Sequence, residues 1–214
     1  MTTKRVIIFT GGSLEETDIK EIQPGDTVIG ADYGAWFLVQ HGITPDLSAG
    51  DFDSVTEDQL RKIQQNSKQF VSCDPINKNL SDTELALEYA IKMKPQEIII
   101  YGAIGTRMDH TLANIQIMSK VLRREISCSI RNQHNRISLI DSVYIVQCND
   151  FPYVSLIPLS NEVTGITLEG FMYPLHDAVL SIGESLGISN RLLHETGTIT
   201  IKEGLLLVIE SRDE

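Results

Sequence analysis

Two aspartates, Asp51 and Asp53, lie two residues apart after Gly50, where an extended segment gives way to a polar turn. Side chains at this spacing on an extended strand project to the same side, so the carboxylates would repel each other unless a cation or strong hydrogen-bond donors lay between them. Such oxygen ligands suit a hard ion like Mg²⁺, which is often held by one or two carboxylates and phosphate oxygens. Aspartate is also common in turns, so the pair alone leaves both interpretations open.

Three further aspartates occupy comparable positions. Asp32 follows an apolar segment, Asp82 begins a predicted helix, and Asp109 follows a loop that contains glycine. An acid in the first helical turn, such as Asp82, also stabilises the positive end of the helix dipole, and the same helix end presents backbone donors to an anion. Repeated aspartates at the ends of predicted strands and starts of helices therefore predict a site for metal and phosphate.

The segment 102–110 offers groups that suit phosphate. Glycines such as Gly105 let a backbone approach phosphate closely, and Arg107 could clamp phosphate oxygens with its fixed charge. The pattern around His110, a lone histidine, favours a neighbour of a helix N-cap or a solvent-facing residue over a binding role. No Walker A spacing is present, and residues 11–13 form only a weak candidate for a phosphate loop.

A polar pair, Ser189 and Asn190, follows Gly187 in a part of the chain that is otherwise apolar. Serine and asparagine are most often turn residues in such a place. Their donors and acceptors could also recognise a heterocycle that binds in a small pocket.

Composition limits the classes of function. The chain has 214 residues, 42% of them hydrophobic, which suits one large or two small domains with a sizeable core. The net charge of −11 disfavours nucleic acid and anionic membranes as partners, but a metal could bridge acidic side chains to the phosphates of ATP. Three cysteines without a CxxC pair, a first apolar run without a signal-peptide pattern and the lack of a membrane-length run predict a cytoplasmic protein.

The first half of the chain alternates apolar runs with helical patterns. This alternation predicts an α/β domain with a mostly parallel sheet that helices cover on both faces, and ligands bind at the carboxyl ends of such strands. A capping box, with Ser81 as N-cap and Glu84 reaching back, predicts the start of one helix. The predicted strands are 6–9, 27–31, 70–73 and 98–101. The predicted helices are one that contains 36–39 and stops at 41–42, then 56–65, a segment after residue 81, and 112–124.

After residue 125 short alternating strands replace the helical patterns. They predict an antiparallel β-sandwich or barrel that ends in a hairpin over 198–209, turning at Glu203 and Gly204. We place the domain boundary between 125 and 150 and divide the chain into residues 1–130 and 131–214. The remaining predicted strands are 127–131, 137–140, 143–147, 154–157 and 165–168.

Several motifs in order resemble the thiamin pyrophosphokinase family. The chain departs from the family pattern in two places: Asn79 stands where the family usually has an acid, and Thr106 stands where it usually has glycine. The motifs are Asp32-Tyr33-Gly34-Ala35, Gly50-Asp51-Phe52-Asp53-Ser54, Lys78-Asn79-Leu80-Ser81-Asp82, Gly105-Thr106-Arg107-Met108-Asp109-His110 and the later Ser189-Asn190.

The resemblance implies an N-terminal α/β domain that binds ATP and Mg²⁺ and a C-terminal β-sandwich that binds thiamin and forms a homodimer. It implies transfer of the diphosphate of ATP to the thiamin hydroxyl, with release of AMP. A pyrophosphokinase for another small alcohol and a non-catalytic nucleotide or thiamin sensor are the alternatives. The resemblance implies catalytic roles for Asp51, Asp53, Asp82, Arg107 and Asp109, and metal binding for Asp51, Asp53 and Asp82. It implies binding of ATP and its metal for Asp32, Lys78, Ser81, Gly105, Thr106 and His110. Thiamin binding is implied for Ser189 and Asn190.

Overall fold

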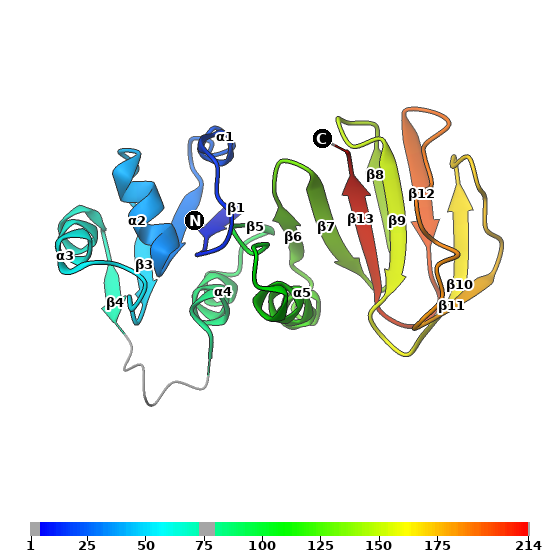
Figure 1. The fold of residues 1–214 in the computed structure, drawn as a ribbon. Coiled ribbons are helices and arrows are strands. Elements are labelled where there is room, and N and C mark those ends of the chain that lie inside the picture. Colours follow the sequence, from blue (N-terminus) through cyan, green and yellow to red (C-terminus); the bar gives the residue numbers. More distant parts are fainter. Residues whose placement is uncertain (1–4, 73–79, 214) are drawn as a thin grey trace. The chain divides into compact units, whose positions relative to one another are not determined.

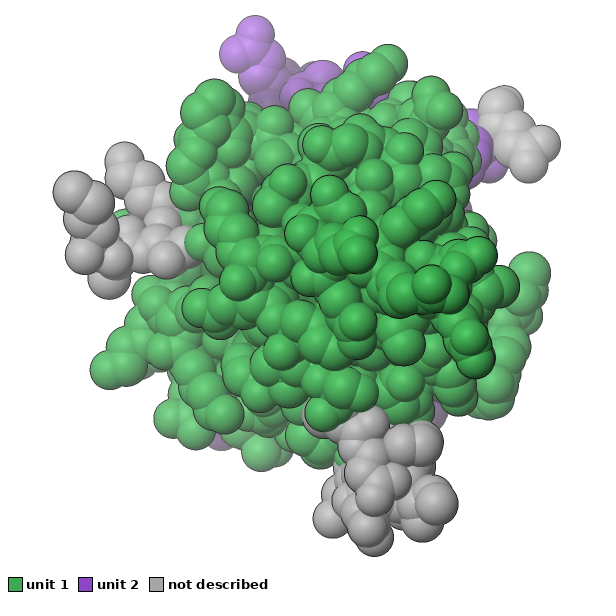
Figure 2. Space-filling view, turned by 90° about the vertical axis from the view of Figure 1, so that its left-hand side faces the viewer, with its two compact units in different colours: residues 1–133 green, residues 134–214 purple. Residues whose placement is uncertain are grey.

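The computed structural model describes residues 5–72 and 80–213, and the chain divides into two compact units, residues 1–133 and 134–214 (Figures 1 and 2). The predicted boundary lies at residue 130. Two predicted features, Lys78 and the departure at Asn79, lie outside the described residues.

Unit 1 contains a parallel sheet whose described strands follow the order β4-β3-β2-β1-β5-β6. Its central strands consist of apolar residues that are buried on both faces, as expected for a sheet covered by helices. The strands are β1 (Arg5–Phe9), β2 (Thr27–Ala31), β3 (Leu47–Gly50), β4 (Phe70–Ser72), β5 (Glu97–Tyr101) and β6 (Ser127–Arg131).

Helices cover both faces of this sheet: Figure 1 shows α1 and α2 on one side and α4 and α5 on the other. Alternate residues of β1 supply the two faces, since Ile7 and Phe9 pack with Phe37 and Leu38 of α2. The predicted α/β domain is thereby confirmed. The helices are α1 (Glu16–Ile19), α2 (Tyr33–Gln40), α3 (Glu57–Asn66), α4 (Asp82–Lys92) and α5 (Met108–Leu122).

The order of strands places a topological switch point between β1 and β5. From β1 the chain proceeds through β2 and β3 to β4, then returns to β5 on the opposite side of β1. Loops leave the two neighbouring strands in opposite directions at such a point, and the crevice beyond their carboxyl ends is the usual ligand site of an open α/β sheet.

Three helix starts differ from the predictions in some respect. Helix α2 begins at Tyr33, before the predicted segment 36–39, and the other two differences concern α4 and α5. Ser81 is the N-cap of α4 and its hydroxyl accepts from the Glu84 N–H, but the Glu84 carboxylate pairs with Lys120 Nζ at 2.6 Å instead of completing the predicted capping box. Helix α5 begins at Met108, one turn earlier than predicted, because the Thr111 N–H donates to the carbonyl of Arg107 and closes the first turn.

Unit 2 consists of two antiparallel groups of strands with a shared apolar core. One group has the order β7-β13-β9 and the other β11-β10-β12-β8. Val154 and Val208 of the first group pack in one cluster with Ile166 and Ile199 of the second, which confirms the predicted sandwich. The strands are β7 (Asn135–Ile140), β8 (Val143–Gln147), β9 (Tyr153–Pro158), β10 (Glu162–Glu169), β11 (Ala178–Ser181), β12 (Thr196–Thr200) and β13 (Leu206–Ser211).

Two strand predictions were wrong about pairing. The segment 127–131, grouped with the antiparallel strands, is β6 and pairs in parallel with β5. The predicted hairpin over 198–209 does not form, since β12 pairs with β8 and β10 while β13 pairs with β7 and β9. Its turn is instead held by β10: the Thr164 N–H donates to the Glu203 carbonyl, so the chain passes from one group of strands to the other.

Candidate functional site

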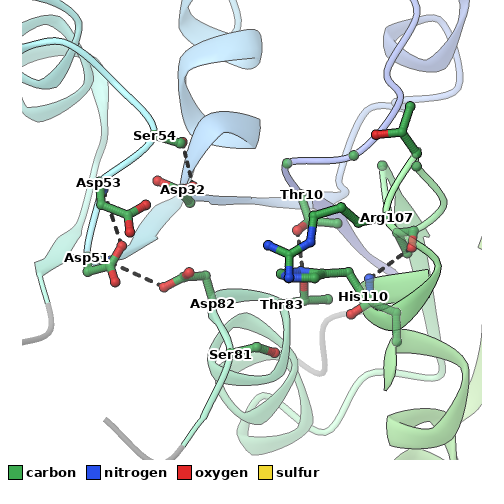
Figure 3. A pocket seen from close by; sticks show the side chains of 17 residues that line it. Thr10, Asp32, Asp51, Asp53, Ser54, Ser81, Asp82, Thr83, Arg107 and His110 are labelled. Atoms are coloured by element: carbon green, nitrogen blue, oxygen red, sulfur yellow. Dashed lines mark hydrogen bonds between the residues drawn. The ribbon is translucent and has the colours of Figure 1, made fainter. Parts of the chain in front are cut away.

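A pocket of ≈ 670 Å³ lies at the switch point of unit 1 (Figure 3). Its volume is within the range of ordinary small-molecule sites. Loops from the carboxyl ends of the strands and the first turns of α4 and α5 form its wall. The lining residues are Thr10, Gly11, Gly12, Asp32, Asp51, Asp53, Ser54, Ser81, Asp82, Thr83, Gly102, Ala103, Gly105, Thr106, Arg107, His110 and Asn114.

Three carboxylates in this pocket come close enough together to share a metal ion. Asp32, Asp51 and Asp53 each offer one oxygen, and these oxygens lie within 4.8 Å of one another. Asp32 and Asp51 are half-buried, whereas Asp53 is exposed. Loops at the adjacent ends of β2 and β3 bring them together, so neighbouring strands convert distant sequence positions into one cluster.

Asp32 is held in an unusual conformation within this cluster. Its φ of 48° and ψ of −120° are rare for a residue with a side chain. One carboxylate oxygen accepts from Ser54 Oγ at 2.5 Å, while the other is buried and has no hydrogen-bond partner among the described residues. A buried oxygen without a partner is costly, and a bound cation would satisfy it.

The electrostatics of the pocket also favour the binding of a cation. Burial raises the pKa of Asp32 above its ordinary value, and the nearby charges of Asp82 and Asp53 raise it further, against the opposing hydrogen bond from Ser54. An acidic cluster in which burial and repulsion both disfavour the ionised form attracts positive charge.

Asp82 lies at the edge of the cluster rather than among its three carboxylates. Its Oδ1 accepts a hydrogen bond from the backbone N–H of Asp51 at 3.2 Å. Asp82 therefore links the first turn of α4 to the turn that follows β3. The three clustered carboxylates are those of Asp32, Asp51 and Asp53, whereas the sequence analysis assigned metal binding to Asp51, Asp53 and Asp82.

Glycine is required where this turn begins. Gly50 has a φ of +151°, which side chains rarely adopt. A Cβ atom there would lie 3.2 Å from both the Asp32 backbone nitrogen and Asp82 Oδ1. The motif Gly50-Asp51-Phe52-Asp53 thus works as a unit in which the glycine lets α4, β2 and β3 approach closely.

Near the start of α5 the pocket is lined by Gly105, Thr106, Arg107 and His110, to which the sequence analysis assigned ATP binding or catalysis. Arg107 is exposed and forms an ion pair with Asp109, with Nη2 and Oδ2 at 2.6 Å. Its guanidinium hydrogen bond holds the pKa of Asp109 below the ordinary value. Asp109 is outside the set of residues that line the pocket, which separates it from the other predicted catalytic acids.

The sequence analysis missed four side chains that line the pocket: Thr10, Ser54, Thr83 and Asn114. Thr10 directly follows β1, next to the weak phosphate-loop candidate, and its position after a buried strand was the available signal. Thr83 and Ser54 are each adjacent to a predicted aspartate, so only their neighbours' importance could have indicated them.

Ser189 and Asn190 lie in unit 2 and have different environments. Asn190 is buried, and its amide is used by the backbone: Oδ1 accepts from the N–H groups of Tyr173 and Arg191, and Nδ2 donates to the Tyr173 carbonyl at 2.8 Å. Ser189 is exposed with a φ of 58°. Of the two side chains, Ser189 is the exposed one.

Among the described residues, no helix combines the length and apolar character that a membrane span requires.

Comparison with known proteins finds matches in both units. The sequence model of the thiamin pyrophosphokinase catalytic domain matches residues 20–130, and that of the thiamin pyrophosphokinase vitamin B1 binding domain matches residues 142–206. Thiamine pyrophosphokinase from Bacillus subtilis is 35% identical over 187 residues, which are 86% of this chain and 87% of that protein.

Solved structures agree with the sequence matches. The crystal structure of the Bacillus subtilis protein has a TM-score of 0.90 at 33% identity, covering 99% of this chain and 100% of that one. The thiamin pyrophosphokinase from Geobacillus thermodenitrificans has a TM-score of 0.87 at 31% identity and covers 98% of both chains. From these matches, which span both units, it follows that the chain belongs to the thiamin pyrophosphokinase family.

Proposed function

We propose that the protein transfers the β,γ-diphosphate of ATP to the hydroxyl of thiamin, producing thiamin diphosphate and AMP. The observation that carries this proposal is the cluster of Asp32, Asp51 and Asp53 in the switch-point pocket, with Arg107 in the same pocket. Family membership supports the same reaction, since the relatives are named for it.

The donor set of the pocket fits Mg²⁺. Three carboxylates offer the hard oxygen ligands that this ion prefers, and a cation would satisfy the Asp32 oxygen that has no hydrogen-bond partner in the described part of the chain. We assign Mg²⁺ binding to Asp32, Asp51 and Asp53. When bound, the ion would neutralise charge on the phosphates of ATP, the contribution that diphosphate transfer most requires.

The side chains of the protein would position the substrates and balance the charge on the phosphates. The thiamin oxygen attacks the β-phosphorus, the bond from that phosphorus to the α-phosphate oxygen breaks, and AMP leaves. Arg107 would donate to phosphate oxygens as their charge redistributes. Asp82 would orient the attacking hydroxyl and accept its proton, because it lines the pocket, whereas the pKa of Asp109 is lowered by its ion pair with Arg107.

Thiamin-dependent formation of AMP from ATP tests the proposal directly. We expect AMP and thiamin diphosphate in equal amounts when ATP, Mg²⁺ and thiamin are present. Thiamin monophosphate, whose hydroxyl is blocked, is the matched control and should yield no AMP. Thiamin binding without AMP would favour a sensor, and AMP formation only with another alcohol would favour a different pyrophosphokinase.

Assembly as a homodimer is a further part of the proposal. Unit 2 exposes several large apolar side chains, a pattern that marks interaction surfaces. Sedimentation equilibrium should give twice the mass of the chain, and a monomer at micromolar concentration would contradict this. The exposed side chains include Met172, Tyr173, Ile182, Leu186, Ile188 and Leu193.

We also propose a cytoplasmic location. The described cysteines, Cys128 and Cys148, are both unpaired, which suits a reducing compartment. Fractionation of cells should recover the protein with cytoplasmic markers.

A further inference from the structure

Two threonine hydroxyls meet on the wall of the pocket. Thr10 Oγ1 and Thr83 Oγ1 lie 2.6 Å apart, and the residues are 5% and 7% exposed. Thr10 directly follows β1 at the switch point, and Thr83 is the second residue of α4. Both line the pocket that contains the carboxylate cluster.

Counting the hydroxyl protons shows that the pair can donate one further hydrogen bond. Each threonine hydroxyl carries one proton and can accept through its oxygen. One hydroxyl donates to the other, so the second hydroxyl still holds a proton. Within residues 5–72 and 80–213, neither Thr10 nor Thr83 has an acceptor for it.

A second hydroxyl pair in unit 1 provides the contrast. Ser48 Oγ and Ser67 Oγ lie 2.8 Å apart, and Ser67 donates to the Ile63 carbonyl at 2.6 Å. Ser48 must then donate to Ser67, so both protons are used inside the fold. This pair lies outside the pocket lining. Of these two pairs, the one that faces the pocket is the one that retains a proton without an acceptor among the described residues.

The surroundings indicate an anion as the acceptor. In Figure 3 the labelled aspartates lie on one side of the pocket, and Thr10, Thr83 and Arg107 lie towards α5. Gly11, also in the lining, has a backbone N–H without a partner in the described part of the chain. Donors that face a cation-binding cluster suit a phosphate group that the cation carries.

We propose that the Thr10–Thr83 pair uses its remaining hydroxyl proton to donate a hydrogen bond to an oxygen of the diphosphate that is transferred. This inference rests on the proposed function, because it takes MgATP as the ligand of the pocket. Neither threonine would enter the covalent step. The pair would hold the diphosphate while the bond to AMP breaks.

Binding of nucleotides to Thr10→Val tests the inference by calorimetry in the presence of Mg²⁺. Valine retains the shape of threonine and removes the hydroxyl. We expect the dissociation constant of MgATP to rise about 10- to 100-fold, the usual effect of losing a hydrogen bond to a charged group. The dissociation constant of AMP should stay within about 2-fold, because AMP lacks the transferred diphosphate.

Three further variants complete the design. Thr83→Val should reproduce the effect, and Thr10→Ser should bind MgATP like the wild type because it retains the hydroxyl. Ser67→Ala removes a hydroxyl from the matched pair outside the pocket and should leave both dissociation constants unchanged, even if it lowers the melting temperature.

A purely structural role would produce other results. If Thr10→Val and Thr83→Val lower only the melting temperature, or weaken AMP and MgATP equally, the inference is wrong. Binding is measured without thiamin, so the test remains valid if the wild type binds MgATP but forms no AMP with thiamin, which would refute the proposed function alone. A wild-type protein that does not bind MgATP would refute both.

Discussion

Asp82 Oδ1 accepts a hydrogen bond from the backbone N–H of Asp51 at 3.2 Å, which fastens the start of α4 to the turn after β3. The two residues are 31 positions apart in the chain. One aspartate thus supplies a carboxylate to the cluster, and the other holds the backbone that carries it. Because the two residues have different roles, we expect their substitutions to have different effects.

Replacing Asp51 removes a carboxylate from the proposed metal site. We expect Asp51→Asn to reduce turnover by about 10²-fold or more, because charge stabilisation by a metal is worth several kcal/mol. The melting temperature without ligand should hardly change, because a half-buried ligand contributes little to the core. Steady-state kinetics and thermal unfolding check both expectations, and wild-type turnover would refute the metal assignment.

Two substitutions of Asp82 separate its hydrogen bond from its charge. Asp82→Asn retains an oxygen that can accept from the Asp51 N–H, whereas Asp82→Ala does not. Both variants should lose turnover by about 10²-fold, as expected for a group that accepts a proton. Only Asp82→Ala should also raise the Mg²⁺ concentration for half-maximal rate, by about 10- to 100-fold. Equal Mg²⁺ requirements in the two variants would argue against the positioning role.

The half-buried carboxylate of Asp32 should make stability depend on pH. Because its pKa is raised in the folded state, the folded protein binds more protons than the unfolded chain in the mildly acidic range, and stability is lost as pH rises through that range. Asp32→Asn removes this loss and tolerates the positive φ of 48°. We expect its melting temperature in EDTA to exceed that of the wild type by about 2–4 °C at pH 7.

The same comparison at acidic pH supplies the control. As pH falls and the Asp32 carboxylate takes up a proton, the advantage of Asp32→Asn should shrink. Asp53→Asn removes the same charge from an exposed position and should show a smaller effect. An advantage of Asp32→Asn that is independent of pH would contradict the electrostatic explanation.

Arg107 is expected to serve the reaction and not the fold. It is exposed, and its ion pair among the described residues is local, with Asp109 two residues away, so Arg107→Ala should leave the melting temperature nearly unchanged. Turnover should fall by about 10²- to 10³-fold, the usual effect of removing a donor that stabilises developing charge. Arg107→Lys should be intermediate, because lysine retains the charge but not the planar fork.

Arg61 offers a matched control for this experiment. It is similarly exposed and pairs with Asp58 at 2.7 Å, but it lies on α3 outside the pocket lining. Arg61→Ala should have wild-type turnover. A comparable loss in both arginine variants would show that the effect of Arg107→Ala is not specific to the pocket.

Ser189 and Asn190 should respond differently to alanine. Asn190→Ala removes the three hydrogen bonds that this buried amide makes with the backbone of Tyr173 and Arg191, so we expect a loss of about 1–3 kcal/mol in the free energy of unfolding. Ser189→Ala should leave stability intact and raise the KM for thiamin. Denaturant titration and kinetics check the pair, and an unstable Ser189→Ala with an unchanged KM would contradict the assignment.

Local patterns in the sequence were sufficient for most elements. The apolar runs at 6–9, 27–31 and 98–101 and the N-cap at Ser81 are confirmed, because periodicity and capping act over a few neighbouring residues. The ordered motifs were sufficient for the family, which the comparisons bear out. The segment 102–110, singled out in the sequence for phosphate binding, also contributes residues to the pocket lining.

Pairing between distant segments could not be predicted in the same way. Residues 198–209 have the pattern of a hairpin, yet β12 and β13 join different groups of strands. The choice depends on burial: Ile199 and Val208 both enter one apolar core from opposite sides of the sandwich. Alternation defines which side chains point inward, but not which strand lies alongside.

The sequence by itself thus determined the types of element, the two-part organisation and the acids available for chemistry. Only the tertiary structure decided that Asp32 joins Asp51 and Asp53, that Asp82 holds the neighbouring backbone, and that Asp109 pairs with Arg107. The physical reason is distance. Periodicity and capping depend on residues a few positions apart, whereas a shared site depends on the order of strands, which is set by the packing of the whole unit.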